Sequence, residues 1–352
     1  MTKINKSLNL DKRKYFILDK RESDILRIVI EDFIAENRPV ASNNIKVRYK
    51  LPFSPATIRT ILARLEKHGL LSHAFTSSGR IPTDLGYRYY VDNIVTHDEK
   101  EFESYENLFD QLSNVSANVD ELMQGTALML AKVSGLFGVV IVSEVQRSIL
   151  TEVELVSLSS DRIMMVIALK SGLLKSLVLN LDISISANDI TIINRILRER
   201  LIGLSVDEIQ TSISDLLNNF KSPQHEIIQI IFQHPQLPFQ LNRNNRLYMS
   251  SYKGLLSNPE FKEYSILQKT ISGLDEKHIT NILSNKNLDK NMLTIIGSES
   301  ENSLLNHCSI IASRFESDSI TGKLGIFGPT RIPYKNIIQI LKEFVEIMPN
   351  VC

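Results

Sequence analysis

Apolar side chains recur with helical spacing in the first quarter of the chain. One such run spans residues 25–33 and follows Asp19 and Glu22, which have the spacing of a capping box at a helix start. Pro39 is expected to end this helix, because proline cannot continue the ladder of backbone hydrogen bonds. Ser42 is predicted to cap a second, short helix.

A third helix is predicted together with a following hairpin. Ser54 has the side chain of a helix cap, Pro55 suits the first helical position, and Gly69 suits the left-handed residue that ends a helix. Two arms, residues 70–76 and 80–83, flank a turn of small residues and predict a β-hairpin. The buried stripe of the helix should follow the spacing i, i+3, i+4 and i+7, with Ile58, Ile61, Leu62 and Leu65.

The rest of the chain predicts a β-rich unit that is split by a helical block. A polar stretch over residues 98–129 favours a connecting helix, residues 187–287 have a mostly helical pattern, and residues 334–348 predict an amphipathic helix. Short runs rich in Val and Ile are typical of antiparallel strands, and they lie at residues 136–144, 151–158, 162–170, 173–180, 291–297, 308–316 and 322–328.

Composition is that of a globular protein with two or three domains. The chain has 352 residues, of which 43% are apolar and 23% charged. Cys308 and Cys352 are too few for a disulfide framework or a cysteine-rich zinc site, which favours a reducing cytoplasm. The start lacks the apolar core of a signal peptide, and the most apolar window, residues 127–142, is too short and interrupted to span a bilayer.

Charge is distributed unevenly along the chain. Residues 1–90 contain 17 Lys/Arg and 9 Asp/Glu, a net charge of +8, although the whole chain is formally neutral. A basic first quarter indicates a polyanionic partner for that quarter alone. Residues 1–17 are predicted to be a basic, solvated and disordered extension, with added phosphate contacts as the alternative.

The third helix and the hairpin together suit DNA. A helix that exposes Arg and small polar side chains fits the major groove, and a hairpin beside it can follow the backbone and place Arg80 in the minor groove. A surface helix and hairpin without a partner is the alternative interpretation. The predicted DNA-binding residues are Ser54, Pro55, Thr57, Arg59, Thr60 and Arg64 on the helix, and Thr76, Ser77, Ser78, Gly79 and Arg80 on the hairpin.

Catalytic, metal and cofactor sites are not predicted. The seven histidines show no ligand spacing with cysteines or carboxylates, and the glycines of residues 322–328 match neither a phosphate-binding loop nor a dinucleotide fingerprint. We therefore do not expect an enzyme.

A long string within the first quarter resembles a known family. Residues 54–92, SPATIRTILARLEKHGLLSHAFTSSGRIPTDLGYRYYVD, are similar to the DNA-binding region of the bacterial heat-inducible transcription repressor family HrcA. A second similarity lies in GIFGPTRIPYKNII, residues 325–338, and a looser one in NRLYMSSYKGLLSNPEF, residues 245–261. The family pattern usually continues with R-N-D where this chain has Arg59, Thr60 and Ile61, which leaves Thr60 to meet a thymine methyl in place of an amide contact.

The resemblance implies an α+β multidomain fold. It consists of an N-terminal winged helix-turn-helix, a GAF-like α/β domain with an antiparallel sheet, and an inserted, mainly helical dimerisation domain. The expected boundaries are a basic extension at 1–17, the winged helix at 18–97, the GAF-like domain at 98–195 and 290–352, and the insert at 196–289.

The resemblance also implies a function and partners. It implies a homodimer that binds double-stranded DNA at an inverted-repeat operator upstream of chaperone operons, represses them at normal temperature and is inactivated by heat. The chaperonin GroEL is the implied modulator, and no membrane is involved. The alternative is a ligand-sensing module, or one that binds protein or RNA, in which the GAF-like domain is the effective site.

Overall fold

The computed structural model of the chain divides into two compact units. It describes residues 18–73, 79–95, 119–143, 148–170, 172, 174–180, 184–218, 246–284, 292–317 and 320–351. The first unit holds the described residues up to Val95 together with Ile296–Ser298 and Thr330–Lys335, and the second holds the others. Paired strands are antiparallel throughout the described residues, which confirms an α+β chain with antiparallel sheets.

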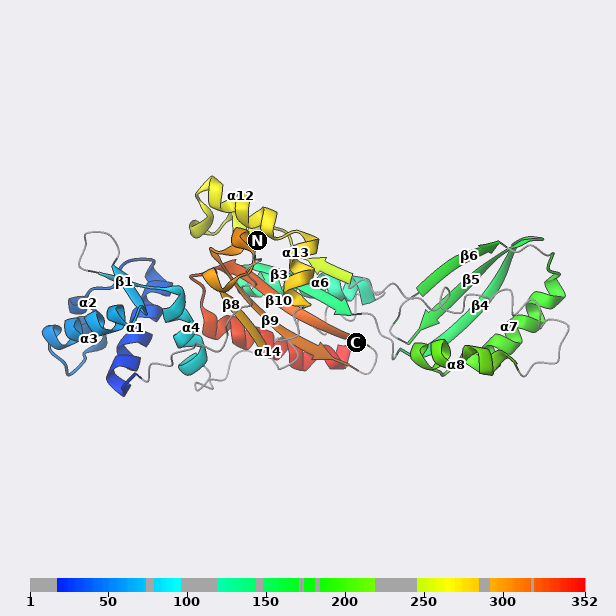
Figure 1. Ribbon diagram of the computed structural model, residues 1–352, viewed down its shortest axis with the longest axis horizontal. Coiled ribbons are helices and arrows are strands. Elements are labelled where there is room, and N and C mark those ends of the chain that lie inside the picture. Colours follow the sequence, from blue (N-terminus) through cyan, green and yellow to red (C-terminus); the bar gives the residue numbers. More distant parts are fainter. Residues whose placement is uncertain are drawn as a thin grey trace, which may run out of the picture. The chain divides into compact units, whose positions relative to one another are not determined.

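The first unit begins with helices whose ends follow local chemistry. Its elements are α1 (Lys20–Glu36), α2 (Ser42–Tyr49), α3 (Pro55–Lys67), β1 (Leu71–His73), β2 (Arg80–Pro82) and α4 (Asp84–Asn93) (Figure 1). The predicted capping box is confirmed, because Asp19 and Glu22 each accept the other's backbone N–H. Helix α1 ends at Asn37 in the left-handed conformation, with φ of 52°, before Pro39 is reached.

The predicted cap of α2 is wrong. Ser42 is the first residue of this helix, and Ala41 occupies the cap position, where no side chain can accept a hydrogen bond. The predictions for α3 are confirmed: Ser54 accepts from the backbone of Thr57, Pro55 opens the helix, and Gly69 follows its end with φ of +74°. The predicted stripe is buried and consists of Ile58, Ile61, Leu62 and Leu65.

Among the described residues, the hairpin pairs part of each predicted arm, and residues 74–76 of the first arm lie outside them. Leu71–His73 pair with Arg80–Pro82, and Val40 adds a bridge to Arg80 through two backbone hydrogen bonds of 2.9 Å. The bridge fixes the backbone of Arg80 on both sides, since β1 holds one edge of β2 and Val40 holds the other.

Two later segments complete the first unit. Ser298 donates its backbone N–H to Asp84 at 2.9 Å, and Arg331 donates to the carbonyl of Ile34 at 2.5 Å. The Ile34 carbonyl lies in the last turn of α1, where backbone acceptors lack helical partners, so the guanidinium supplies one.

The second unit contains a five-stranded sheet among its described residues. The order is β7-β3-β10-β9-β8, and the strands are β3 (Phe137–Ser143), β7 (Arg246–Met249), β8 (Met292–Ile296), β9 (Cys308–Glu316) and β10 (Thr321–Pro329). The pattern of Val and Ile identified β3, β8, β9 and β10, whereas β7 lies in a stretch that was predicted to be mostly helical. The helices of this part are α6 (Val119–Ser134), α11 (Lys253–Leu256), α12 (Tyr264–Gly273), α13 (Glu276–Leu283) and α14 (Tyr334–Val351).

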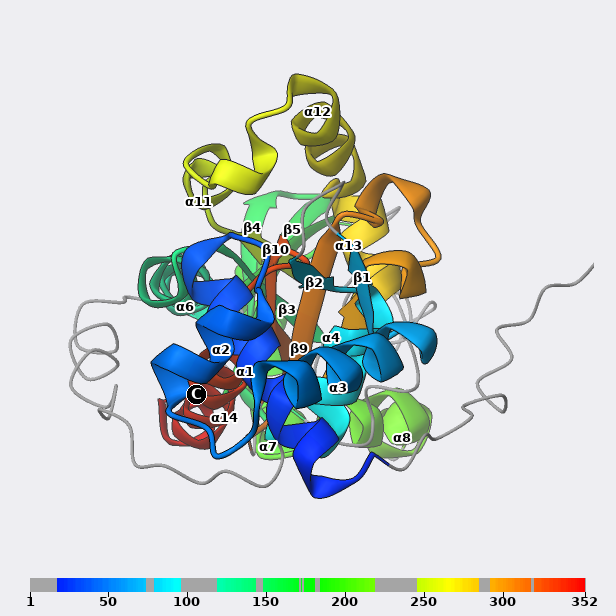
Figure 2. The same ribbon diagram turned by 90° about the vertical axis from the view of Figure 1, so that its left-hand side faces the viewer.

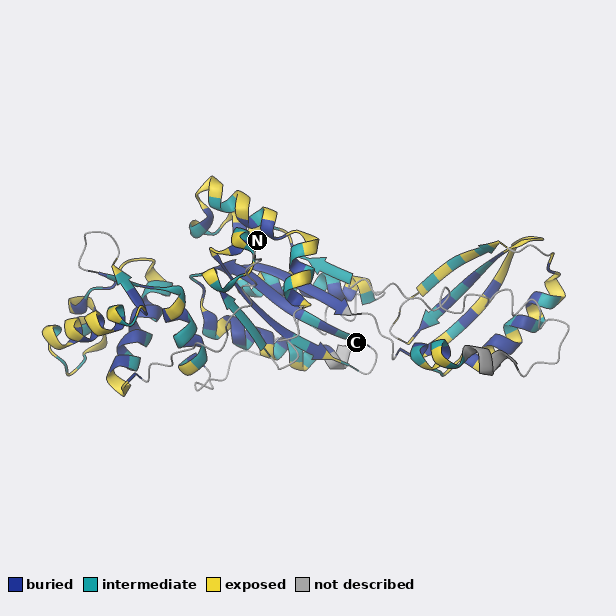
Figure 3. Cartoon of the chain, in the orientation of Figure 1, coloured by how far each residue is buried: buried dark blue, intermediate teal, exposed yellow. Residues whose placement is uncertain are grey.

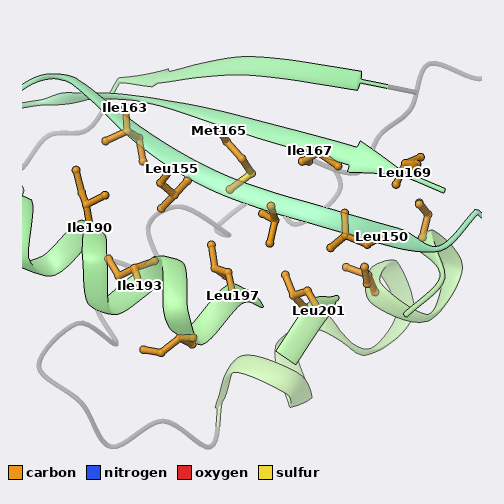
Figure 4. Packing of buried hydrophobic residues seen from close by; sticks show 14 of the residues in the cluster. Leu150, Leu155, Ile163, Met165, Ile167, Leu169, Ile190, Ile193, Leu197 and Leu201 are labelled. Carbon is orange, nitrogen blue, oxygen red and sulfur yellow. The ribbon is translucent and has the colours of Figure 1, made fainter. Parts of the chain in front are cut away.

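A separate three-stranded sheet has its own hydrophobic core. Its strands are β4 (Leu150–Ser159), β5 (Arg162–Leu169) and β6 (Leu174–Asn180), and one face packs on α7 (Ala187–Leu201) and α8 (Val206–Asn218) (Figure 4). Met165 and Leu155 from the sheet face Ile193 and Leu197 from α7 in this core.

The predicted domain boundary between residues 195 and 196 falls inside α7. This helix shares its core with β4 and β5, so the cut divides one packed layer. The sequence placed all early strands in one β-rich unit, because an alternating pattern gives the buried face of a strand but not the sheet to which it belongs.

Candidate nucleic-acid interface

Helix α3 has a buried side and an exposed side (Figure 3). Figure 2 shows α3 at the front of the first unit when that unit is turned toward the viewer. The exposed side carries most of the predicted helix residues, namely Ser54, Thr57, Arg59, Thr60 and Arg64, whereas Pro55 is half-buried. The helix therefore presents one continuous polar surface to a partner.

The polar groups of this surface differ in how many hydrogen bonds they already form within the protein. Ser54 is occupied by capping, since its hydroxyl oxygen accepts from the Thr57 N–H at 3.1 Å and lies 2.9 Å from the Thr57 hydroxyl. Thr60 donates its hydroxyl to the carbonyl of Ala56 at 3.1 Å. Its methyl group is then the part of the side chain left for apolar contact. Arg59 forms no hydrogen bond or ion pair with any described residue, so its five donors are available to a partner.

Three further residues of this surface were not predicted. Ala56, Ala63 and Lys67 are exposed on α3 beside the predicted residues. The two alanines let the helix backbone approach a partner closely, and Lys67 adds a second cation that has no ion pair among the described residues. The helical period could have found them, because positions 56, 60, 63 and 67 follow one stripe.

Arg64 belongs to this surface and also holds the fold. Its Nη1 lies 2.9 Å from Oε1 of Glu22, the capping-box residue of α1, while its side chain remains 61% exposed. The ion pair joins the start of α1 to the middle of α3. Only the Arg64 end of the pair is exposed, because the side chain of Glu22 is 10% exposed, so moving the guanidinium to a phosphate leaves a buried carboxylate without its cation.

Of the predicted hairpin residues, the structure describes Gly79 and Arg80. Thr76, Ser77 and Ser78 lie outside the described residues. Gly79 is buried, and a Cβ there would lie 2.5 Å from Cβ of Pro39, so close packing requires the glycine. The side chain of Arg80 is only 11% exposed and is paired with Glu66, whereas the prediction placed it in the minor groove.

Arginine side chains elsewhere in the unit serve the fold. Arg48 of α2 lies 3.2 Å from Asp32 of α1 and also pairs with Glu36. Tyr49 donates its hydroxyl to Asp32 at 2.6 Å, and burial together with this hydrogen bond raises the pKa of Tyr49 to about 12. Because Asp32 is buried, these partners compensate its charge and tie α2 to α1.

Other chemistry is weakly supported in the part of the chain that the structure describes. Groups of His, Cys, Asp and Glu that could hold a metal ion are absent from those residues. Cys308 is buried against Thr270, and burial raises the pKa of its thiol to about 11, which leaves it protonated and unreactive at neutral pH. None of the helices searched in those ranges is long and apolar enough to span a bilayer.

Comparisons with known proteins show similarity over nearly the whole chain. Residues 120–338 match the family model described as the HrcA protein C terminal domain. The heat-inducible transcription repressor HrcA of Chlorobaculum parvum is 32% identical over 339 residues, which cover 93% of this chain and 95% of that protein. The protein of the same name from Chlorobium chlorochromatii is 31% identical over 333 residues, with the same coverage of 93% and 95%.

A solved structure is similar over nearly the whole chain. The crystal structure of a hypothetical protein has a TM-score of 0.61 and 18% identity, and it covers 95% of this chain and 98% of that one. At this identity the likeness shows the fold alone. The family match and the two relatives decide the classification: this chain belongs to the HrcA family of heat-inducible transcription repressors.

Proposed function

We propose that the chain is a DNA-binding transcription repressor of the heat-shock response. The observation that carries this proposal is the exposed surface of α3, where Arg59 and Lys67 lie among small side chains on a helix with a firmly buried opposite side. In this proposal α1 to α4 and the hairpin form a winged helix-turn-helix, and α3 is the recognition helix that enters the major groove.

The small side chains of the recognition helix allow it to approach the base edges at the floor of the major groove. Arg59 can form a bidentate pair of hydrogen bonds with guanine, and the methyl group of Thr60 can contact the methyl group of thymine. Ala56 and Ala63 have short side chains, so the helix can lie close to the bases between these contacts. The operator is proposed to lie upstream of chaperone operons, with repression at normal temperature, loss of binding on heating, and GroEL as the modulator of activity.

A homodimer is proposed from the uncovered face of the three-stranded sheet. Val156, Met164 and Val178 stand opposite one another across β4, β5 and β6, on the face away from α7. Val156 is 38% exposed and Val178 47%, and Leu174 on the same strand as Val178 is 72% exposed. Exposed apolar side chains that gather on one face are typical of an interface between proteins. The same face on a second copy gives a two-fold pair, whose two recognition helices require an inverted repeat.

The test of the function is selection of DNA from a random pool of duplexes by the full-length protein. We expect the selected sequences to form an inverted repeat, and the same repeat to be protected in a footprint of the region upstream of the chaperonin operon of the source genome. The logarithm of affinity should fall steeply with the logarithm of salt concentration, because several phosphates are neutralised. Equal affinity for selected and scrambled duplexes would contradict the proposal and favour a module that binds protein, RNA or a small ligand.

Placing a charge on the apolar face should separate the dimer. Met164→Glu puts a carboxylate between Val156 and Val178 on this face. In sedimentation velocity at micromolar concentration we expect the variant to be monomeric, and we expect it to bind the duplex with two half-sites more weakly. Leu256→Glu is the matched control, because Leu256 is 60% exposed on α11, outside the sheet. A Met164→Glu protein that remains dimeric would contradict this choice of interface.

A further inference from the structure

We propose that Arg80 positions the hairpin against the recognition helix and does not enter DNA. The unit that does this is a triad of Glu66 from α3, His73 from β1 and Arg80 from β2. The inference rests on the proposed function, since the positioned hairpin is the proposed wing beside the DNA. It replaces the expectation that Arg80 reaches the minor groove.

Each of the three side chains of the triad contacts the other two. Arg80 approaches Oε2 of Glu66 with Nε at 3.0 Å and Nη2 at 2.9 Å, and its Nη1 lies 3.0 Å from Nδ1 of His73. Nε2 of His73 lies 3.2 Å from the other Glu66 oxygen. Because arginine only donates, Nδ1 of His73 accepts from Arg80. Arg80 thus forms hydrogen bonds with both Glu66 and His73, and His73 also approaches Glu66 within ion-pair distance.

The surroundings hold Arg80 away from a DNA partner. Its side chain is 11% exposed, and its backbone N–H and carbonyl both bond to Val40 at 2.9 Å. Insertion into a groove would require the guanidinium to leave Glu66 and His73 together. The triad instead links the recognition helix to both strands of the hairpin, so it fixes the angle between the two proposed DNA-contacting elements.

The two roles of Arg80 predict opposite effects of one substitution. If Arg80 binds DNA, Glu66 competes with DNA for the guanidinium, and Glu66→Gln should tighten binding. If Arg80 positions the hairpin, Glu66→Gln breaks the triad and should weaken binding. The sequence of the hairpin turn, residues 74–79, contains no charged residue. A displaced hairpin therefore loses no cation, and the salt dependence of binding should stay as it is.

The experiment uses full-length protein and duplexes selected by the wild type. We expect Glu66→Gln and Arg80→Ala each to bind about tenfold more weakly in gel-shift titrations at fixed salt, as the loss of one charged hydrogen bond predicts. The double variant should bind no more weakly than either single one, since both remove the same unit. Unchanged or tighter binding by Glu66→Gln, or a salt slope shallower by about one for Arg80→Ala, would overturn the proposal.

Two controls separate positioning from misfolding. Arg80→Lys keeps the charge but not the two-pronged geometry, so it should lose as much affinity as Arg80→Ala; retained binding would contradict the proposal. Without DNA, amide hydrogen exchange in residues 71–73 and 80–82 should be faster in Glu66→Gln, with the protection of α1 unchanged. Unchanged exchange at the hairpin would also contradict it. A wild type that selects no duplex would refute the proposed function, while the exchange result would still decide whether the triad holds the hairpin.

Discussion

Replacing Arg59 by alanine is expected to weaken operator binding by about 10- to 100-fold. The guanidinium is exposed on α3 and makes no hydrogen bond or ion pair with another described residue. Its N–H donors are therefore available to the edge of a guanine. A two-pronged contact of this type contributes about 1–3 kcal/mol of discrimination between bases. The measurement is a gel-shift titration at fixed salt on the selected duplex, with the dimer checked by sedimentation.

Arg27→Ala is the matched control for this prediction. It removes the same charge from the same unit, but from α1, where Arg27 lies near Asp24 and Glu31. Its affinity for the duplex should remain within about twofold of the wild type, because only long-range charge is lost. If both arginine variants lose the same affinity, general electrostatic attraction explains the binding, and the assignment of Arg59 as a base contact fails.

Replacing Gly86 by alanine is expected to destabilise the first unit by about 3 kcal/mol. A Cβ at this position in α4 would lie 2.1 Å from the carbonyl oxygen of Leu70, a backbone atom just before β1. Alanine is favoured over glycine within a helix by about 1 kcal/mol, which is too little to offset such overpacking. Thermal unfolding of the full-length variant, followed by circular dichroism, should show a lower unfolding temperature. In a gel-shift titration the variant should lose DNA binding.

Asn93→Ala provides the comparison in the same helix. Asn93 is exposed at the last residue of α4 and bonds only to the Tyr89 carbonyl among the described contacts, so its loss should change stability by about 0.5 kcal/mol or less. An unfolding temperature of Gly86→Ala equal to that of Asn93→Ala would show that α4 can move away from Leu70 at little cost.

Local rules predicted helix α3 from the sequence. Cap, first-turn proline, apolar stripe and stop glycine all act within a few residues, and each is present in α3. The same rules erred at Ser42, where the helix starts one residue early and Ala41 takes the cap position. A difference of one residue changes a cap into a first-turn residue, because only the cap backbone is non-helical.

Contacts between distant residues were not predictable in this way. Arg80 was assigned to DNA because it follows a small-residue turn, yet Glu66 captures it from a helix fourteen positions earlier. Strand β3 pairs with β7 and β10, which lie far along the chain, and not with β4, its neighbour in sequence. An alternating pattern defines the faces of a strand, while its partners depend on how the whole chain closes.

The first unit is built from segments that lie far apart in the sequence. Its contacts can therefore form only in a fixed order during synthesis. Arg331 and Ser298, which bond to Ile34 and Asp84, leave the ribosome long after α1 to α4 have emerged. At about 5–20 residues per second, the delay between Val95 and Lys335 is on the order of 10–50 s. A nascent chain therefore carries its helices for most of its translation without the contacts that complete their packing, and a prematurely terminated chain never acquires them.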